Sequence, residues 1–110
     1  MEQEYVLIHN SNKLEDRQAV GYFRSKKDIQ LNEKDIYYDM LTEKQILEVS
    51  QKLDVDLSEL LVSDLKGREN FSDEELLKLM ANNPNNFRTP IVLSKEKSFI
   101  VDSPLNLIKE

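Results

Sequence analysis

The chain has 110 residues and a net charge of −6, with 39% hydrophobic and 33% charged residues, which is enough to bury a substantial core and is ordinary for a globular protein. It has no cysteine and one histidine, so disulfides, thiolate nucleophiles, thiolate zinc sites and multi-histidine metal sites are excluded. We expect a single domain spanning residues 1–110, with no metal and no cofactor.

The excess of acidic over basic residues also restricts the partners that this protein is expected to bind. A net negative protein repels a phosphate backbone, so direct binding of nucleic acid is not expected. No apolar run approaches the roughly 20 residues of a membrane span. The first four residues, Met1-Glu2-Gln3-Glu4, have a net negative charge and lack the apolar core of a signal peptide, which favours a cytoplasmic location.

The first third of the chain has the pattern of a β-α-β unit. Residues 5–8 form a short apolar run typical of a buried strand, and residues 10–12 have turn-forming side chains. A helix is expected from Leu14 to about Ser25, followed by a polar loop over residues 26–33. Residues 35–39 are predicted to be the second strand, parallel to the first because the connection has the length of a right-handed crossover. In this strand one of the two tyrosines would be buried and the other exposed.

The middle of the chain is predicted to be helical. Thr42 and Ser72 each begin a capping-box sequence with an apolar residue on either side, which predicts helices from about 43 to 53 and from about 73 to 82. A short helix is expected after Asp56. Carboxylates at 73–75 are interpreted as partners of the helix dipole in the first turn.

The last part of the chain returns to strands. Residues 90–93 and 98–101 are predicted to form an antiparallel hairpin. A proline at 104 then predicts the start of a final helix that contains Leu105, Leu107 and Ile108.

Two motifs in this order resemble the arsenate reductase and Spx-type branch of the thioredoxin-like fold. The first is His9-Asn10 at the end of the first strand, followed by Lys13 and Arg17. The second runs from residues 73–80 through Asn83-Pro84 to Arg88-Thr89-Pro90-Ile91-Val92. The resemblance covers essentially the whole chain. It implies an α/β (α+β) fold with a small mixed four-stranded sheet flanked by helices, a helical insertion between the β-α-β unit and the C-terminal hairpin, and a cis-proline at Pro90.

The sequence departs from this family where its chemistry resides. Lys13 occupies the position of the nucleophilic cysteine, and a lysine cannot form a thiol–arsenate adduct or a mixed disulfide. By the resemblance, three arginines would hold the oxyanion. The one directly before the cis-proline aligns with Thr89, although Arg88 is one residue away. The one in the mid-chain loop falls near Val62, and the one before the last helix falls near Asp102. The Cys-x-x-Cys of Spx-type regulators is also missing.

The leading hypothesis is a cysteine-free, arsenate reductase- or Spx-like protein without redox activity, which acts as an interaction or regulatory module for a protein partner. It has no catalytic residue in this interpretation. Its vestigial site comprises His9, Asn10, Lys13, Arg17, Thr89 and Pro90.

The alternative is an arsenate reductase-like oxidoreductase or oxyanion-binding protein. Lys13, Arg17 and Arg88 would then bind a small oxyanion at the N-terminus of the first helix, and an external protein would supply the thiol. A solvated lysine that fills a vacated site is favoured over an anion ligand at Lys13, because a cation at this position is also repelled by the helix dipole and needs no ligand. His9 can be a general base, but a structural histidine at a strand end is favoured because no nucleophile is evident beside it.

Overall fold

The computed structural model describes residues 3–62 and 71–101. The predicted final helix and the polar stretch from 63 to 70 lie outside the described residues. The elements, in chain order, are β1 (Gln3–His9), α1 (Leu14–Arg24), β2 (Ile29–Asp35), α2 (Glu43–Leu53), the 3₁₀ helix η1 (Leu57–Leu60), α3 (Asp73–Asn82), the 3₁₀ helix η2 (Pro84–Asn86), β3 (Ile91–Ser94) and β4 (Phe99–Ile100).

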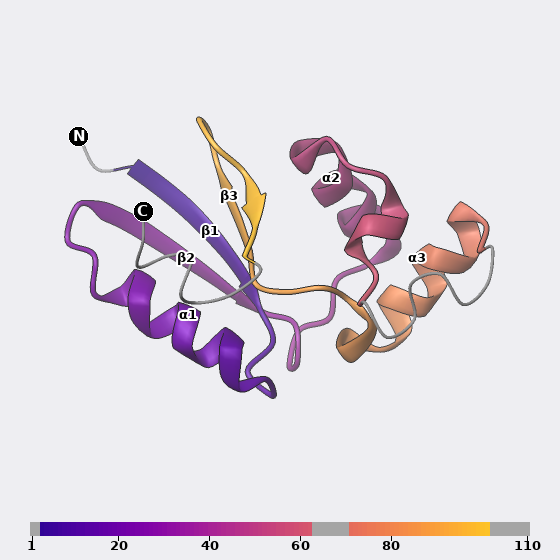
Figure 1. The fold of residues 1–110 in the computed structure, drawn as a ribbon, viewed down its shortest axis with the longest axis horizontal. Helices are drawn as coiled ribbons and strands as arrows, with labels where there is room; N and C mark the ends of the chain where they lie inside the picture. The colour runs from indigo at the N-terminus through magenta and orange to yellow at the C-terminus, as the bar shows by residue number, and fades with distance from the viewer. Residues whose placement is uncertain (1–2, 63–70, 102–110) are drawn as a thin grey trace.

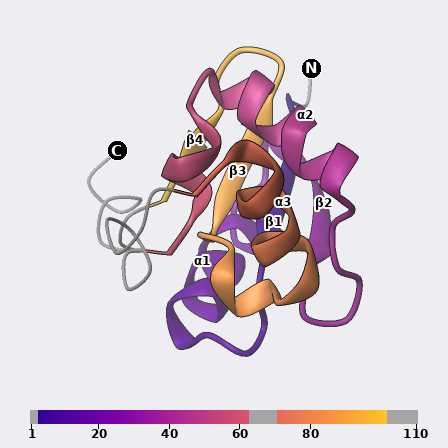
Figure 2. The same ribbon diagram turned by 90° about the vertical axis from the view of Figure 1, so that its right-hand side faces the viewer.

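The strands form one mixed sheet in the order β2-β1-β3-β4 (Figures 1 and 2). β1 lies parallel to β2 and antiparallel to β3, and β3 pairs antiparallel with β4. The predicted mixed four-stranded sheet, the parallel crossover and the C-terminal hairpin are therefore confirmed. The Thr89–Pro90 peptide bond, directly before β3, is cis.

The two faces of the sheet belong to two separate cores. On one face, Leu7 of β1 and Val92 of β3 pack against Ala19, Val20 and Phe23 of α1. On the other face, alternate residues of the same two strands face the helical insertion. Their cluster comprises Ile8, Ile91, Leu93, Ile36, Leu41, Ile46, Val49, Leu57, Leu60, Leu61, Leu76, Met80 and Phe87. The alternation follows from the two-residue period of a strand.

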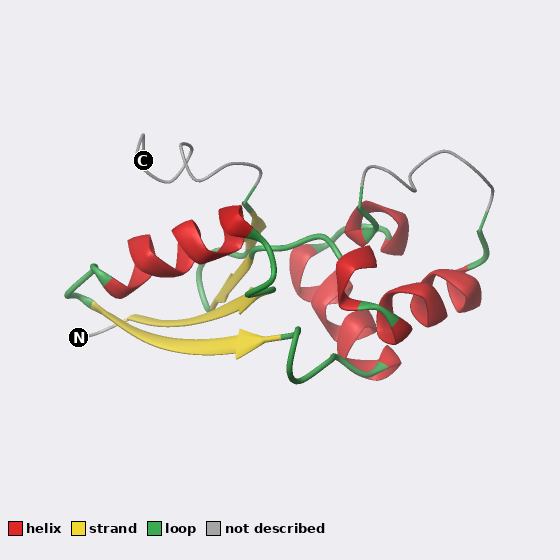
Figure 3. Cartoon of the chain, turned by 90° about the horizontal axis from the view of Figure 1, so that it is seen from below, coloured by secondary structure: helices red, strands yellow, loops and turns green. Residues whose placement is uncertain are grey.

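The helices lie on the two faces of the sheet in agreement with these two cores. Figure 1 shows α1 along one side of the sheet, while α2, η1 and α3 gather together on the right of the view. Figure 3 shows the same separation from below, with the three helical elements beyond the ends of β1 and β2. Within the described residues, no helix is long and apolar enough to cross a membrane.

The second strand does not lie where the sequence predicted it. β2 spans Ile29–Asp35, the stretch predicted to be a polar loop, and the predicted strand at 35–39 is largely a turn. Tyr37 and Tyr38 are both exposed, so the expected burial of one of them is also wrong. β2 pairs only with β1 in the described sheet, and an edge strand with half-buried side chains need not form an apolar run.

The two capping boxes form as predicted. Thr42 accepts a hydrogen bond from Gln45 N–H and its own N–H donates to Gln45 Oε1. Ser72 and Glu75 repeat this exchange at α3. The hydrogen bond from the Ser72 N–H lowers the pKa of the Glu75 carboxyl. Asp56 stands at the start of η1 but makes no side-chain cap there.

The hydrogen bonds of the Ser72 cap contribute to the free energy of unfolding. Ser72→Ala is expected to lower the free energy of unfolding by about 1 kcal/mol, because the Glu75 N–H loses its acceptor. The matched control is Ser58→Ala, which removes an exposed hydroxyl within η1. Urea unfolding of both variants measures the difference, and equal midpoints for the two would contradict the assignment.

Candidate functional site

The candidate site lies at the C-terminal end of β1, where residues 10–13 lead into α1. Asn10 is fully buried, and its Oδ1 accepts a hydrogen bond from the Asn12 N–H at 3.0 Å. Its carbonyl accepts from the Lys13 N–H, and its Nδ2 donates to Asn85 Oδ1 at 3.0 Å. Asn10 therefore shapes the turn and ties it to η2, the segment just before Pro90.

Lys13 is the N-cap residue of α1 but provides no side-chain cap. Its ammonium donates instead to the Phe87 carbonyl at 3.3 Å. Lys13 therefore links the start of α1 to Phe87, two residues before Thr89.

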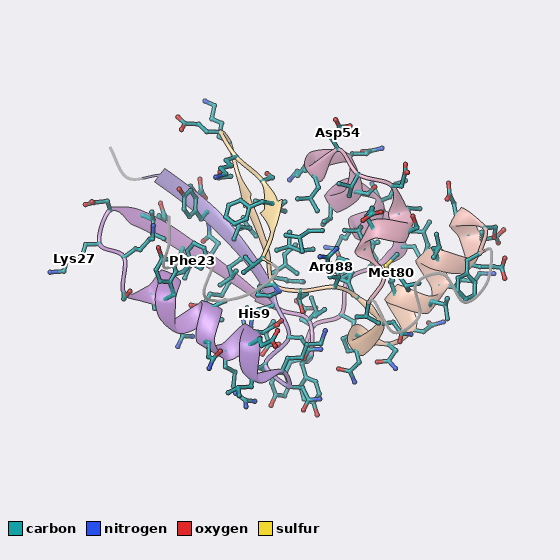
Figure 4. All side chains as sticks on the ribbon, viewed as in Figure 1. His9, Phe23, Lys27, Asp54, Met80 and Arg88 are labelled. Carbon is teal, nitrogen blue, oxygen red and sulfur yellow. The ribbon has the colours of Figure 1, made fainter. Side chains whose placement is uncertain are left out.

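The other two predicted cations bind different segments. Arg17 Nη1 donates to the Ser11 carbonyl at 2.9 Å, which places its guanidinium over the turn. Arg88 instead faces η1, where its N–H donates to the Leu60 carbonyl and its Nη1 lies 3.5 Å from the Glu59 carbonyl. Figure 4 shows Arg88 between the sheet and the helical insertion, with His9 at the end of β1. Each of the three predicted cations thus contacts a different backbone carbonyl.

Asp16 belongs to the site and was not predicted from the sequence. It is the third residue of α1, is only 1% exposed, and accepts a hydrogen bond from the Asn10 N–H at 2.7 Å. Burial raises the pKa of its carboxyl. The Thr89 hydroxyl, the Asn10 N–H and the charges of Lys13 and His9 act in the opposite direction without reversing the shift.

Thr89 and His9 both influence this carboxyl. The Thr89 hydroxyl is buried and close enough to influence Asp16, although it makes no hydrogen bond of good geometry within the described residues. His9 is 6% exposed, and neither ring nitrogen has a hydrogen-bond partner there. Its Nε2 lies 3.9 Å from Glu33 Oε1, which also binds Arg24.

Asp35 fastens the turn to the end of β2. Its Oδ1 accepts from the Ser11 N–H and from the Tyr37 N–H, both at 3.1 Å. Burial raises the pKa of Asp35, but hydrogen bonds from Ser11 and Tyr37 more than compensate, so the net shift is downward. Residues 9–14 and 35–37 are therefore hydrogen-bonded to one another at the C-terminal ends of β1 and β2.

Comparison with solved structures finds the same architecture. An arsenate reductase from Vibrio cholerae superposes with a TM-score of 0.81 at 15% identity, covering 99% of this chain and 98% of that one. A candidate arsenate reductase from Yersinia pestis gives 0.76 at 21% identity, with 96% and 99% covered. A candidate ArsC-family related protein from Bacteroides fragilis gives 0.73 at 14% identity, with 96% and 95% covered. This chain has the arsenate reductase-like form of the thioredoxin-like fold.

The sequence comparisons add nothing to this assignment, because no protein-family model and no curated protein matches the chain. Within the arsenate reductase-like fold, Lys13 lies at the start of α1 beside the cis-proline segment. Val62, near which the resemblance placed an arginine, donates its backbone N–H to the Asn86 carbonyl. Asp102, near which the resemblance placed another arginine, lies outside the described residues.

The chemistry available to this site is narrow. A lysine ammonium, an arginine and a buried carboxyl can hold charge, but the chain has no thiol to exchange electrons with a substrate. In the part of the chain that the structure describes, no three histidine, aspartate or glutamate side chains gather as metal ligands.

Proposed function

We propose that this chain is a non-catalytic protein with an arsenate reductase-like fold that acts as an interaction or regulatory module for a protein partner. The observation that carries the proposal is Lys13, which stands at the start of α1 in a chain without cysteine. Its ammonium donates a hydrogen bond to the Phe87 carbonyl, so the position that the resemblance gives to the nucleophile is held by a side chain with a structural partner.

An arsenate reduction assay tests the absence of catalysis. The purified protein is incubated with arsenate, glutathione and glutaredoxin, and arsenite is measured against a buffer blank. The expected result is no arsenite above the blank, because no residue of the chain can form the covalent thiol–arsenate intermediate. Turnover that disappears in Lys13→Ala would refute the proposal.

The second candidate is an oxyanion-binding protein or an oxidoreductase supplied with an external thiol. It is supported by the uncapped N-terminus of α1 with Lys13 and Arg17 beside it, since free backbone N–H groups and cations both favour an anion. Arg88 is the weakest member of this set, because its guanidinium contacts the η1 segment. The buried Asp16 carboxyl under the first turn opposes an incoming anion.

Inorganic phosphate and arsenate distinguish the two candidates. Titration to millimolar concentration is expected to leave the Lys13 and Leu14 amide resonances unchanged in an NMR spectrum. Saturable shifts at these two amides that are lost in Arg17→Gln would instead favour the oxyanion-binding protein.

A further inference from the structure

His9 is buried at the end of β1 without a hydrogen bond to its ring. It is the only histidine in the chain, and its side chain is 8% exposed. Neither ring nitrogen has a hydrogen-bond partner within the described residues. An unpaired polar atom in a protein interior costs free energy, because it has given up its hydrogen bonds to water. The neutral ring of His9 is therefore not satisfied by its present contacts.

The register of β1 and β2 places two carboxylates beside His9. In this parallel pair, Leu7 is the partner of Glu33, and His9 is the partner of Asp35. Because side chains alternate along a strand, all four residues lie on the face of the sheet that α1 covers. Asp16 contributes a third carboxylate from α1 itself. The electrostatic influence of His9 reaches all three carboxyl groups.

Two cations act on the same carboxylates. Arg24, the last residue of α1, donates to Glu33 twice, from Nε to Oε2 at 2.8 Å and from Nη2 to Oε1 at 2.7 Å. Lys13 acts on Asp16 from the turn before α1. Residues 89–94, which include β3, contain no charged side chain. Within the described residues, a charge on His9 would therefore face more negative groups than positive ones.

Glu33 and Asp35 remain ionised at neutral and mildly acidic pH. The hydrogen bond from Arg24 lowers the pKa of Glu33 and outweighs the opposite effect of burial. Burial raises the pKa of Asp35, but hydrogen bonds from neighbouring residues outweigh it, so the net shift is downward. Histidine is the side chain that gains a proton in this range, between about pH 8 and 5. Mild acidification is therefore the condition under which a positive charge on His9 would meet carboxylates that are still negative.

A charged His9 and Arg24 would compete for one oxygen, Glu33 Oε1. The protonated ring has an N–H at both nitrogens, and Nε2 lies 3.9 Å from this oxygen, about 1 Å beyond a charge-assisted hydrogen bond. The Arg24 side chain is 65% exposed, so water can replace one of its hydrogen bonds to Glu33 at little cost. Water has little access to the His9 ring, and a buried charge without a partner is costly. Transfer of Oε1 from Arg24 to His9 is therefore favoured once the ring is charged.

We propose that His9 is a proton-sensitive switch between β1 and the α1–β2 contact. When the ring is neutral, both oxygens of Glu33 bind Arg24 and join the end of α1 to β2. When the ring is protonated, Glu33 Oε1 accepts a hydrogen bond from His9 Nε2, and Arg24 keeps at most one of its two hydrogen bonds. Proton uptake thus tightens the contact between β1 and β2 and loosens the contact between α1 and β2. This switch is independent of the interaction role given above.

An NMR titration of the full chain from pH 8 to 5 tests the switch, because the single histidine gives one set of ring signals. The ring ¹⁵N shifts measure protonation of His9, and the Nε–H signal of Arg24 measures its bond to Glu33. Both are expected to change with the same midpoint, and the Arg24 change should be lost in His9→Gln. Asp16→Asn removes a neighbouring carboxyl whose pKa is raised by burial, and it should leave the Arg24 response in place.

Glu33→Gln and Arg24→Gln form a matched pair, because each variant breaks the same ion pair. Glu33→Gln removes the carboxylate that stabilises the charged ring, so the midpoint of the ring titration should move to lower pH. Arg24→Gln removes the competing cation and frees Glu33 Oε1, so the midpoint should move to higher pH. Lys27→Gln, which removes an exposed cation of the α1–β2 loop, should leave the midpoint unchanged.

Several results would overturn the switch. One is a ring that stays neutral down to pH 5, and another is an Arg24 signal that does not follow the ring or that still titrates in His9→Gln. Midpoints that move in the same direction in Glu33→Gln and Arg24→Gln would show that the ion pair acts on His9 only through the fold. Unfolding midpoints establish which variants are folded. If His9→Gln does not fold, the matched pair still decides the question, because both of its members keep the ring.

Discussion

Asp16→Ala is expected to lower the free energy of unfolding by about 1–3 kcal/mol, the cost of leaving a buried donor without a partner. The Asp16 carboxylate is the acceptor for the Asn10 N–H at 2.7 Å, and both residues are fully or almost fully buried. Alanine removes the acceptor of this hydrogen bond. Urea unfolding at neutral pH measures the loss.

Two comparisons isolate this hydrogen bond. Asp16→Asn keeps an oxygen at the position of the acceptor and should therefore lose less stability than Asp16→Ala. Glu15→Ala removes an exposed carboxylate one residue earlier in α1 and should change the unfolding free energy by less than about 0.5 kcal/mol. If Asp16→Ala and Glu15→Ala were equivalent, the buried network would have no structural role.

The ionisation of Asp16 makes the stability of the folded protein depend on pH in one direction. Burial raises the pKa of its carboxyl in the folded protein above the value in the unfolded chain, which is about 3.9. The folded state therefore binds the proton more tightly. The stability that the folded protein gains from this raised pKa of Asp16 is fully present below the unfolded pKa. It is lost as the pH rises through the folded pKa.

Asp16→Asn removes this titration. The stability of the unmodified chain relative to Asp16→Asn should therefore rise as the pH is lowered through the folded pKa towards about 4. Unfolding free energies measured at several pH values for both proteins give the difference directly. A difference that falls with acidification would mean that hydrogen bonding and nearby cations outweigh burial at this carboxyl.

Phe87→Ala is expected to have the largest effect, a loss of about 3–5 kcal/mol in unfolding free energy. Phe87 is 1% exposed and packs in the cluster between the sheet and the helical insertion. Its carbonyl also accepts the hydrogen bond from Lys13. The substitution therefore opens a cavity in the core and loosens the segment before Pro90.

Phe71 provides the matched control for Phe87. It packs against the same cluster but is only partly buried, so Phe71→Ala should lose distinctly less stability. Denaturant unfolding followed by circular dichroism compares the two variants. Equal losses for Phe71→Ala and Phe87→Ala would show that the insertion is not anchored through Phe87.

The helices whose first residues form a capping motif in the sequence were predicted well. The capping boxes at Thr42 and Ser72 place the starts of α2 and α3, because the bonds that make a cap join residues three positions apart. β2 was predicted at the wrong place because it is an edge strand with polar side chains at Gln30 and Asn32. The aromatic run after it looked more like a strand but forms a turn.

The candidate site was predicted in part. His9, Asn10, Lys13 and Arg17 do gather around the first turn of α1, and Thr89 joins them from the segment before β3. The position of Arg88 facing η1 could not be predicted, because it depends on how the helical insertion packs.

The burial of Asp16 could have been predicted from the sequence. It precedes Ala19, Val20 and Phe23 by three, four and seven residues, which places it on the buried face of α1. A charged residue at such a position requires a partner, and the partner here is a backbone N–H in the preceding turn. Helical spacing should therefore be checked for charged residues as well as for apolar ones.

The central place of β1 has a consequence for the protein during its synthesis. β1 is made first, but the strand that covers its second edge, β3, follows about 80 residues later. At roughly 5–20 residues per second, translation leaves that edge open for about 4–16 seconds. Val6, Leu7 and Ile8 lie along it, and an apolar strand with an unpaired edge is prone to intermolecular pairing. The nascent chain is thus most exposed to aggregation before the ribosome has completed the hairpin.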